Sequence, residues 1–504
     1  MKYAVIGDHN FICEECGITV KASKVLKRWD GAWVCKQCWE PRQPQDSTSP
    51  LPVEQAFPRP VNSQKIAISS TNKYFTITDG NGEEYTYSCG ANITRSYGDL
   101  LVAPYANGYV CTGFSFTLKT PDNETEIVPA TLGGGDMMGY SCDLNSDGTV
   151  GIFGAPNDGS GAGSIYVQNR AVLVWSDDTK LTYSAATTSS QIGTDVAIND
   201  DGDMIVSADI NSQKLVIWRK SGGSWSEDTV ITPTTAPTAS SKFGSSLAMN
   251  GDGTRIAAAT WDASAINKVW IFDYDGASWS ETIVITPSVT NNNNPGLFIA
   301  LSSNGDYLVI GDPYNDTGGT NRGYFFIHFV NEGGASLWGE QYSGQASLTP
   351  TDNDLAGKGV DLDCDGDTCV IGVPGRVTGY IDVYNRSGST WTNTDFATNS
   401  IGSYPGSNMG WDLSLSRDGL VCLCGTPNWS GADEKGLIFV MDDSDQDGTW
   451  TQSYYSNYTN RANTDHYGWS VALSATANWG IGGIPGADDG GANSGIGLAH
   501  QFYT

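Results

Sequence analysis

The sequence predicts an all-β protein whose main body is a seven-bladed β-propeller. A phrase of three strands and a tight turn occurs seven times, each copy 51 to 61 residues after the one before. The copies begin at Gly139, Gly193, Gly244, Gly296, Gly357, Gly410 and Gly468. Repetition at about 50 residues, with several short strands per unit, is typical of propellers and arrays of β modules. Only 16% of the residues are charged, and 61 are glycine. This composition favours short strands joined by many turns.

Each copy contains the signals of a hairpin followed by a sharp corner. The first strand alternates apolar residues, as at Val196 and Ile198, which indicates a half-buried strand. Six copies have a turn glycine nine residues after the first one, usually preceded by Asp, and such pairs suit a two-residue hairpin turn. A buried second strand then leads in five copies to a Gly-x-Pro corner, at residues 154–156, 311–313, 372–374, 425–427 and 483–485.

A tryptophan introduces the fourth strand in six copies, namely Trp175, Trp225, Trp279, Trp338, Trp391 and Trp450. Because a repeated position usually serves the repeated interface, we expect each ring to pack between its own blade and a neighbour. A set of sugar-binding rings is the alternative.

The seventh copy ends at its third strand, so its fourth strand must come from elsewhere or leave an open edge. Residues 126–132 resemble the other fourth strands, and we expect them to close a propeller over residues 126–504. The alternative is eight blades, with residues 85–132 as a degenerate blade and 65–69 as the closing strand. Residues 63–125 are predicted to hold extra β-strands, including 74–78 and 84–88 around an Asp-Gly-Asn-Gly turn.

Residues 1–46 form a candidate zinc module. The chain reads C-x2-C, eighteen residues, then C-x2-C, with Cys13, Cys16, Cys35 and Cys38 as the candidate ligands. This spacing suits a tetrahedral structural Zn²⁺, and the metal would supply much of the folding free energy of so short a segment. Two disulfides or a redox C-x-x-C are the alternatives. Residues 47–62 are rich in proline and predict a semi-extended linker.

Between the cysteine pairs, Asp30-Gly31 predicts a hairpin turn with Trp33 and Val34 on the returning strand. Trp29, Trp33 and Trp39 either cover the metal as a small core or dock a partner, since Trp and Arg are favoured anchors at interfaces.

The charge distribution argues against several classes of function. The net charge is −29, and residues 1–46 hold seven Lys/Arg and six Asp/Glu, so the acidity lies in the main body, which should repel nucleic acid. We expect no membrane insertion, because no run of 18 apolar residues occurs. The short apolar run at the start does not read as a signal peptide. We therefore expect the protein to stay where it is made, with reduced cysteines.

The repeat resembles the FG-GAP family, the integrin-α-like propeller repeat. Phe243-Gly244 and the corner at 154–156 match its two marks, and the Ser-Gly-x-x-Trp turns at 221–225 and 387–391 match its bacterial variant. The resemblance implies a propeller. Typical members hold Ca²⁺ in a D-x-D/N-x-D-G-x-x-D loop. The loop at 143–151 lacks the closing carboxylate and the one at 363–366 is incomplete, so calcium is not expected.

The first segment resembles four-cysteine zinc modules of tailed-bacteriophage proteins, through a phrase of the form RWDG…VC..CWEPR.PQD. Here the phrase is carried by residues 28–31, 34–35, 38–42 and 44–46. The resemblance implies a phage protein and does not reveal what the module does.

The sequence contains no recognised catalytic motif. None of the four histidines, His9, His328, His466 and His500, lies in a nucleophile or metal motif, so no enzyme and no catalytic residue is predicted. We predict a structural protein of a tailed-phage virion, a capsid decoration, neck or tail nozzle, or fibre, made in the host cytoplasm. The zinc module would anchor it to capsid, neck or tail proteins in copies that follow particle symmetry, and the propeller would contact proteins or host-surface glycans. The alternative is a cellular adhesion or carbohydrate-binding propeller.

Overall fold

The computed structural model describes residues 10–12, 19–21, 24–27, 32–36, 74–78, 84–88, 124–171, 174–289, 296–331, 337–398, 406–429, 435–443, 448–456, 462, 464–488 and 494–502. The chain divides into two compact units, residues 1–116 and residues 117–504. Among the described residues, no helix is long and apolar enough to cross a membrane.

Three antiparallel hairpins make up the described part of the first unit. They pair β1 (Asn10–Ile12) with β2 (Thr19–Lys21), β3 (Val25–Lys27) with β4 (Trp33–Cys35), and β5 (Tyr74–Thr78) with β6 (Glu84–Ser88). The last two hairpins match the strands predicted around the turns at 30–31 and 79–82. In β4, Val34 and Cys35 are buried.

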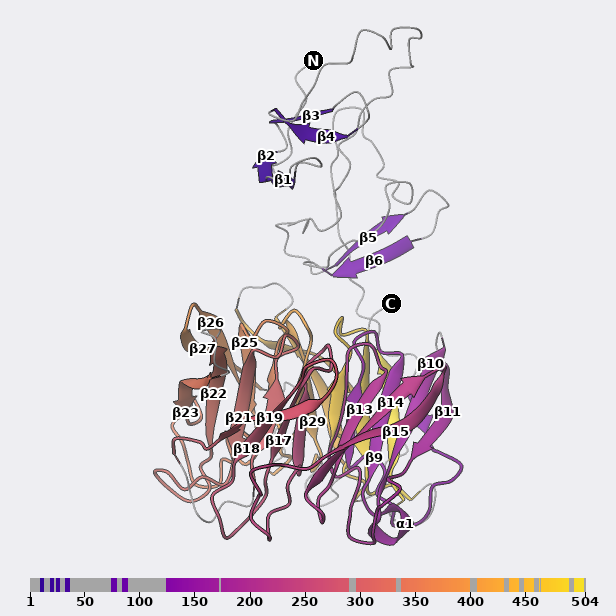
Figure 1. The fold of residues 1–504 in the computed structure, drawn as a ribbon. Coiled ribbons are helices and arrows are strands. Elements are labelled where there is room, and N and C mark those ends of the chain that lie inside the picture. Colours follow the sequence, from indigo (N-terminus) through magenta and orange to yellow (C-terminus); the bar gives the residue numbers. More distant parts are fainter. Residues whose placement is uncertain are drawn as a thin grey trace. The chain divides into compact units, whose positions relative to one another are not determined.

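The second unit is a seven-bladed propeller, as predicted, in which every blade is a four-stranded antiparallel sheet (Figure 1). The first strands of successive blades contact one another in a closed ring, from β8 through β32 and back to β8. These seven first strands are the inner strands of the propeller.

The first four blades are built from consecutive strands. Blade 1 has β8 (Ser141–Leu144), β9 (Val150–Ala155), β10 (Ser164–Ala171) and β11 (Val174–Leu181), with the single turn α1 (Asp158–Gly161) between β9 and β10. Blade 2 has β12 (Val196–Ile198), β13 (Met204–Asp209), β14 (Lys214–Ser221) and β15 (Ser224–Ile231). Blade 3 has β16 (Ser246–Met249), β17 (Arg255–Ala259), β18 (Val269–Tyr274) and β19 (Trp279–Ile285). Blade 4 has β20 (Phe298–Leu301), β21 (Tyr307–Asp312), β22 (Tyr324–Asn331) and β23 (Leu337–Gly344).

The remaining blades complete the ring. Blade 5 has β24 (Val360–Leu362), β25 (Thr368–Gly372), β26 (Ile381–Ser387) and β27 (Thr390–Ala397). Blade 6 has β28 (Leu413–Leu415), β29 (Val421–Thr426), β30 (Leu437–Asp442) and β31 (Thr451–Ser456). Blade 7 has β32 (Val471–Leu473), β33 (Trp479–Ile484), β34 (Ile496–Gln501) and, from the other end of the sequence, β7 (Glu124–Ile127).

The closing strand β7 pairs with β34 from Gly497↔Ile127 to His500↔Glu124. It lies at 124–127, so the prediction of 126–132 was right about the region and wrong about the bounds. The reason is Pro129, which has no N–H to donate to a ladder and whose carbonyl instead accepts from Leu132 N, at 3.1 Å, in a turn. Seven blades account for all seven copies, and the eight-bladed alternative is not adopted.

The two repeated glycines explain how tightly neighbouring blades pack. A Cβ built on Gly372, in the corner of blade 5, would lie 2.8 Å from the carbonyl carbon of Gly410, the first glycine of blade 6. Real Cβ atoms essentially never approach so closely. The same contact joins four other pairs, Gly154 with Gly193, Gly311 with Gly357, Gly425 with Gly468, and Gly483 with Gly139. Backbone meets backbone at these five interfaces, where a Cβ would clash. Blades 2 and 3 have Ala208 and Ala259 at the corner position instead.

The six repeated tryptophans pack against neighbouring blades, as predicted. Trp175 of blade 1 meets Trp479 of blade 7 edge-on, with ring centroids 6.2 Å apart, and Trp391 of blade 5 meets Tyr307 of blade 4 at 6.1 Å. The other four, Trp225, Trp279, Trp338 and Trp450, belong to or pack against hydrophobic clusters that join two blades. These rings are interface residues rather than a row of exposed binding surfaces.

Candidate functional site

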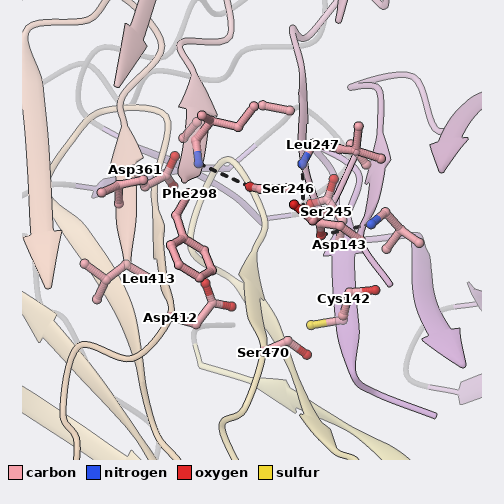
Figure 2. Close-up of a pocket in the computed structure, with 18 of the residues that line it drawn as sticks. Cys142, Asp143, Ser245, Ser246, Leu247, Phe298, Asp361, Asp412, Leu413 and Ser470 are labelled. Atoms are coloured by element: carbon pink, nitrogen blue, oxygen red, sulfur yellow. Dashed lines mark hydrogen bonds between the residues drawn. The ribbon is translucent and has the colours of Figure 1, made fainter. Parts of the chain in front are cut away.

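The inner strands enclose a central cavity of about 600 Å³ (Figure 2). Residues of all seven blades line it, which places it on the axis of the ring. The cavity has two ends. The strand-start end is where the inner strands begin, and the turn end is where the hairpin turns connect first and second strands.

Four aspartates line the cavity, and they come from four different blades. Asp143 and Asp361 lie within β8 and β24, whereas Asp195 and Asp412 immediately precede β12 and β28. Each aspartate lies two or four residues after the first glycine of its copy. Because alternate residues of an extended chain point to the same side, all four can face the cavity. Figure 2 shows Asp143, Asp361 and Asp412 around the cavity.

Each of these carboxylates bridges two blades. Asp143 Oδ2 accepts a hydrogen bond from Ile198 N of blade 2 at 2.8 Å, and Asp195 Oδ2 accepts from Leu247 N of blade 3 at 2.7 Å. Asp361 Oδ2 accepts from Leu415 N at 2.6 Å, and Asp412 Oδ2 accepts from Val471 N at 2.8 Å. Since an inner strand is the edge of its sheet, its outward N–H groups lack ladder partners. The aspartates satisfy these donors.

Serine hydroxyls make the same bridge elsewhere in the ring. Ser246 Oγ accepts from Ile299 N at 3.2 Å, and Ser414 Oγ accepts from Leu473 N at 3.0 Å. The bridge therefore requires an acceptor and does not require a charge. Four negative charges around one cavity are more than the ring needs to hold its inner strands together.

Burial makes these charges costly. It raises the pKa of Asp143, Asp195 and Asp361 to about 7 and that of Asp412 to about 6. Hydrogen bonds from backbone N–H groups oppose the shift, and repulsion among the carboxylates adds to the raised pKa of the first three. Desolvation disfavours the ionised form of a carboxyl group, which is the cause of the shift.

A lysine ammonium lies among aromatic rings on the cavity wall. Lys358 Nζ is 3.9 Å from the ring centroid of Phe298 and 4.2 Å from that of Trp411. These are cation–π contacts. Burial lowers the pKa of Lys358 to about 8, although Asp412 and Asp195 favour its charged form.

An arc of aromatic rings continues from Trp411 across the next two blades. Trp411 and Trp469 have ring centroids 5.2 Å apart, and Trp469 and Tyr140 are 5.7 Å apart. All three residues line the cavity near the first residues of their inner strands. On the far side Lys242 Nζ lies 4.4 Å from the ring centroid of Trp261, a side chain that is 37% exposed. The strand-start end of the cavity thus combines aromatic rings with access to solvent.

The turn end is closed by a continuous circle of backbone hydrogen bonds between the seven hairpin turns. The seven donor–acceptor distances are 2.8 to 3.3 Å. One turn supplies two adjacent residues, Ser303 as acceptor and Asn304 as donor, and each other turn supplies one residue that does both, namely Ser146, Asp200, Gly251, Cys364, Arg417 and Ala475. The Arg417 guanidinium of blade 6 pairs with Asp200 of blade 2 and donates to Ser303 Oγ of blade 4 at 3.0 Å. Because these blades are not neighbours, the side chain crosses the axis.

The loop that resembles a calcium site is organised as a hydrogen-bonded turn. Asn145 Oδ1 accepts from the N–H groups of Thr149 and Val150 at 2.9 and 2.8 Å, while its amide donates to Asp147 Oδ1 at 2.9 Å. Asp143, the first residue of that motif, is directed to Ile198 of the next blade instead. Within the described ranges no cluster of His, Cys, Asp and Glu is arranged to hold a metal ion.

Of the four predicted zinc ligands, only Cys35 lies in the described part of the chain. It ends β4 and is 4% exposed. Cys13, Cys16 and Cys38 lie outside the described residues, so the zinc module stays a prediction.

Sequence reasoning missed the cavity because it read the aspartates as turn residues. A signal was present, since an Asp two or four residues after a repeat glycine interrupts an otherwise apolar or small-residue strand. Aligning the seven copies residue by residue would have placed all four on one wall.

Comparison with known proteins supports the fold alone. No family model and no curated protein matches the chain. The chain is similar to a solved structure of U3-55K, with 10% identity and a TM-score of 0.51, over 75% of this chain and 99% of that one. It is also similar to a chain of a mitotic checkpoint complex (13% identity, TM-score 0.49, 82% and 99% covered). A third similar structure is a putative 6-phosphogluconolactonase from Bacteroides uniformis (12% identity, TM-score 0.42, 63% and 84% covered).

The cavity carboxylates predict a pH-dependent stability. A carboxyl group with a folded-state pKa of about 7 contributes stability that is present below its unfolded pKa, about 4, and is lost as the pH rises through about 7. The unfolding free energy of the unaltered protein should therefore fall between about pH 5 and pH 7.5. In Asp361→Asn this fall should be smaller by about 1 to 2 kcal/mol, a value reduced to allow for solvent screening of this half-buried group.

Urea unfolding at the two pH values measures that difference. The quantity compared is the change in unfolding free energy between the two pH values, which is free of any constant effect of losing one hydrogen bond. The opposing contributions of His328 and His500, whose pKa values burial lowers to about 4 and about 3, are the same in both proteins and cancel. Asp201→Asn is the matched control, because Asp201 is exposed and Asn-Gly already serves as the turn at Asn304-Gly305. Equal slopes for Asp361→Asn and the control would contradict the assignment.

Proposed function

We propose that this chain is a non-enzymatic structural component of a tailed-bacteriophage virion. In this proposal the four-cysteine segment binds zinc and anchors the chain to capsid, neck or tail proteins, and the propeller projects to contact proteins or host-surface glycans. The resemblance of residues 28–46 to phage zinc modules supports the phage assignment. The FG-GAP-like marks of the repeat support a role in contact rather than catalysis.

The proposed separation of an anchoring zinc module from a contacting propeller is supported by the position of β7 in the ring. β7 comes first in the sequence of the propeller unit and pairs as the outer strand of blade 7. Glu124 in β7 accepts a hydrogen bond from Ser456 Oγ of blade 6 at 2.8 Å, and its Oε1 lies 3.7 Å from His500 Nδ1 of blade 7. β7 therefore contacts both blade 6 and blade 7. A zinc module that is bound to the particle would hold the propeller through this strand.

The zinc module leads to a prediction about metal content. The purified full chain should carry one Zn²⁺ per molecule, because four thiolates complete a tetrahedral site. Cys35→Ser should reduce this several-fold, whereas Cys142→Ser, which alters a propeller cysteine, should leave it unchanged. Elemental analysis after exhaustive dialysis measures the ratio. Equal zinc in the Cys35→Ser chain and the full chain would rule out the predicted ligand set.

The anchoring role is tested by incorporation into particles. Phage particles would be assembled in host cells that supply the full chain, the Cys35→Ser chain or residues 117–504 alone, with the phage copy of the gene removed. Only the full chain should copurify with particles in a density gradient. Incorporation of residues 117–504 at the level of the full chain would show that the propeller, not the zinc module, makes the attachment.

A further inference from the structure

We propose that the central cavity binds an organic cation, an alkyl diamine or polyamine, which enters at the strand-start end and places ammonium groups between the aromatic arc and the four aspartates. This inference rests on the geometry of the cavity and does not depend on the proposed virion role.

Acidic side chains outnumber basic ones on the cavity wall. The charged residues that line the cavity are four aspartates and two lysines, of which Lys242 lies exposed at the rim. Serines show that the inter-blade bridge works without charge. Each bridging oxygen accepts one backbone hydrogen bond and keeps acceptor capacity for another donor. A cavity with this surplus of carboxyl groups favours a ligand that brings N–H donors and a positive charge to stabilise their ionised form.

Independently of the aspartates, the protein already holds one alkylammonium group, that of Lys358, on the cavity wall. The Lys358 side chain puts its ammonium against the rings of Phe298 and Trp411. Trp469 and Tyr140 extend the same arc away from Lys358. Aromatic faces attract ammonium groups most strongly where water is excluded. The internal lysine is therefore a guide to the chemistry that the rest of the arc accepts.

The spacing of the four aspartates also suits an extended diamine. Asp195 and Asp412 lie at the second residue after the repeat glycine, and Asp143 and Asp361 lie at the fourth. Two residues of a strand span about 7 Å, so the carboxylates form two levels along the axis. An extended putrescine spans a comparable distance between its two ammonium groups. At the turn end the Arg417 guanidinium crosses the axis, which leaves the strand-start end as the entrance and disfavours a cation beyond the second level.

Binding should be linked to protons. An ammonium group near the cavity favours the ionised carboxylates and lowers their pKa, so protons leave as the ligand binds. Affinity should consequently rise as the pH increases through about 7, the value for three of the four aspartates. A neutral sugar would show no such dependence.

The experiment is isothermal titration calorimetry of the full chain with putrescine and with spermidine at physiological ionic strength. We expect one saturable site per chain and an affinity about tenfold higher at pH 8 than at pH 6. Asp361→Asn and Trp469→Leu should each weaken binding about tenfold. Asp382→Asn is the matched control, because Asp382 is fully buried with a pKa raised to about 6 and pairs with Ser347 outside the cavity. Its affinity should equal that of the unaltered chain.

Melting curves establish that each variant is folded, and Asp143→Asn replaces Asp361→Asn if the latter is not. Several outcomes would overturn the proposal. One is no saturable binding of either amine. A second is weak binding that neither Asp361→Asn nor Trp469→Leu reduces, which would indicate the acidic outer surface. A third is saturable binding of a neutral oligosaccharide, or of Mg²⁺ alone, in place of the amines.

Discussion

A chain that begins at residue 130, and so lacks β7, is expected to lose about 3 to 6 kcal/mol of unfolding free energy and to aggregate. The estimate combines the burial of Ile127, 3% exposed, at about 2 to 3 kcal/mol, with the backbone hydrogen bonds between β7 and β34 at about 1 kcal/mol each. Without β7, β34 becomes an open edge that can pair with another chain.

Residues 117–504 provide the control for this truncation. This piece keeps β7 and forms a compact unit, so it should unfold at the same urea concentration as the propeller of the full chain. Urea unfolding gives the free energies, and analytical ultracentrifugation reports aggregation. If the chains beginning at 117 and 130 had the same midpoint, β7 would not be closing the ring.

The Gly372→Ala substitution is expected to destabilise the propeller by about 2 to 3 kcal/mol. The new methyl group would meet the backbone of Gly410, not a flexible side chain, so blades 5 and 6 would have to separate locally. Overpacking in a well-packed interior costs about 1 to 3 kcal/mol, and a closed ring cannot relieve a separation at one interface without straining the others.

Gly339→Ala is the matched control for this substitution. Gly339 lies in the outer strand β23, and a Cβ there would have no neighbour within 4 Å. Its unfolding free energy should change by less than about 0.5 kcal/mol. A similarly small effect of Gly372→Ala would show that the glycine–glycine contacts do not set the spacing of the blades.

The features that were predictable from the sequence are those that every blade needs. Turn glycines recur in six copies and Gly-x-Pro corners in five, because most blades make the same turns and the same contacts. The strand pairs β3–β4 and β5–β6 were also predictable, because the Asp-Gly signals between their strands are local. The bounds of the closing strand were predicted wrongly. The prediction followed the similarity of residues 126–132 to other fourth strands, although Pro129 cannot donate to a ladder and the pairing ends at Ile127.

The candidate site was not predicted because it consists of the positions at which the copies differ. Asp143 and Asp412 are far apart in the sequence, and they line one cavity only after the ring has closed. At the residue after the repeat glycine, lysine occurs only as Lys358, and tryptophan occurs in two copies, as Trp411 and Trp469. A repeat consensus removes such residues, whereas the structure brings them together.

The central claim is that the chain is part of a virion, and quantitative mass spectrometry of purified, DNA-filled phage particles tests it most directly. The account predicts a fixed copy number relative to the portal and major capsid proteins, and a multiple of five, six or twelve would indicate a vertex, tail or neck position. Absence of the chain from intact particles would contradict the virion assignment and favour the cellular adhesion or carbohydrate-binding alternative.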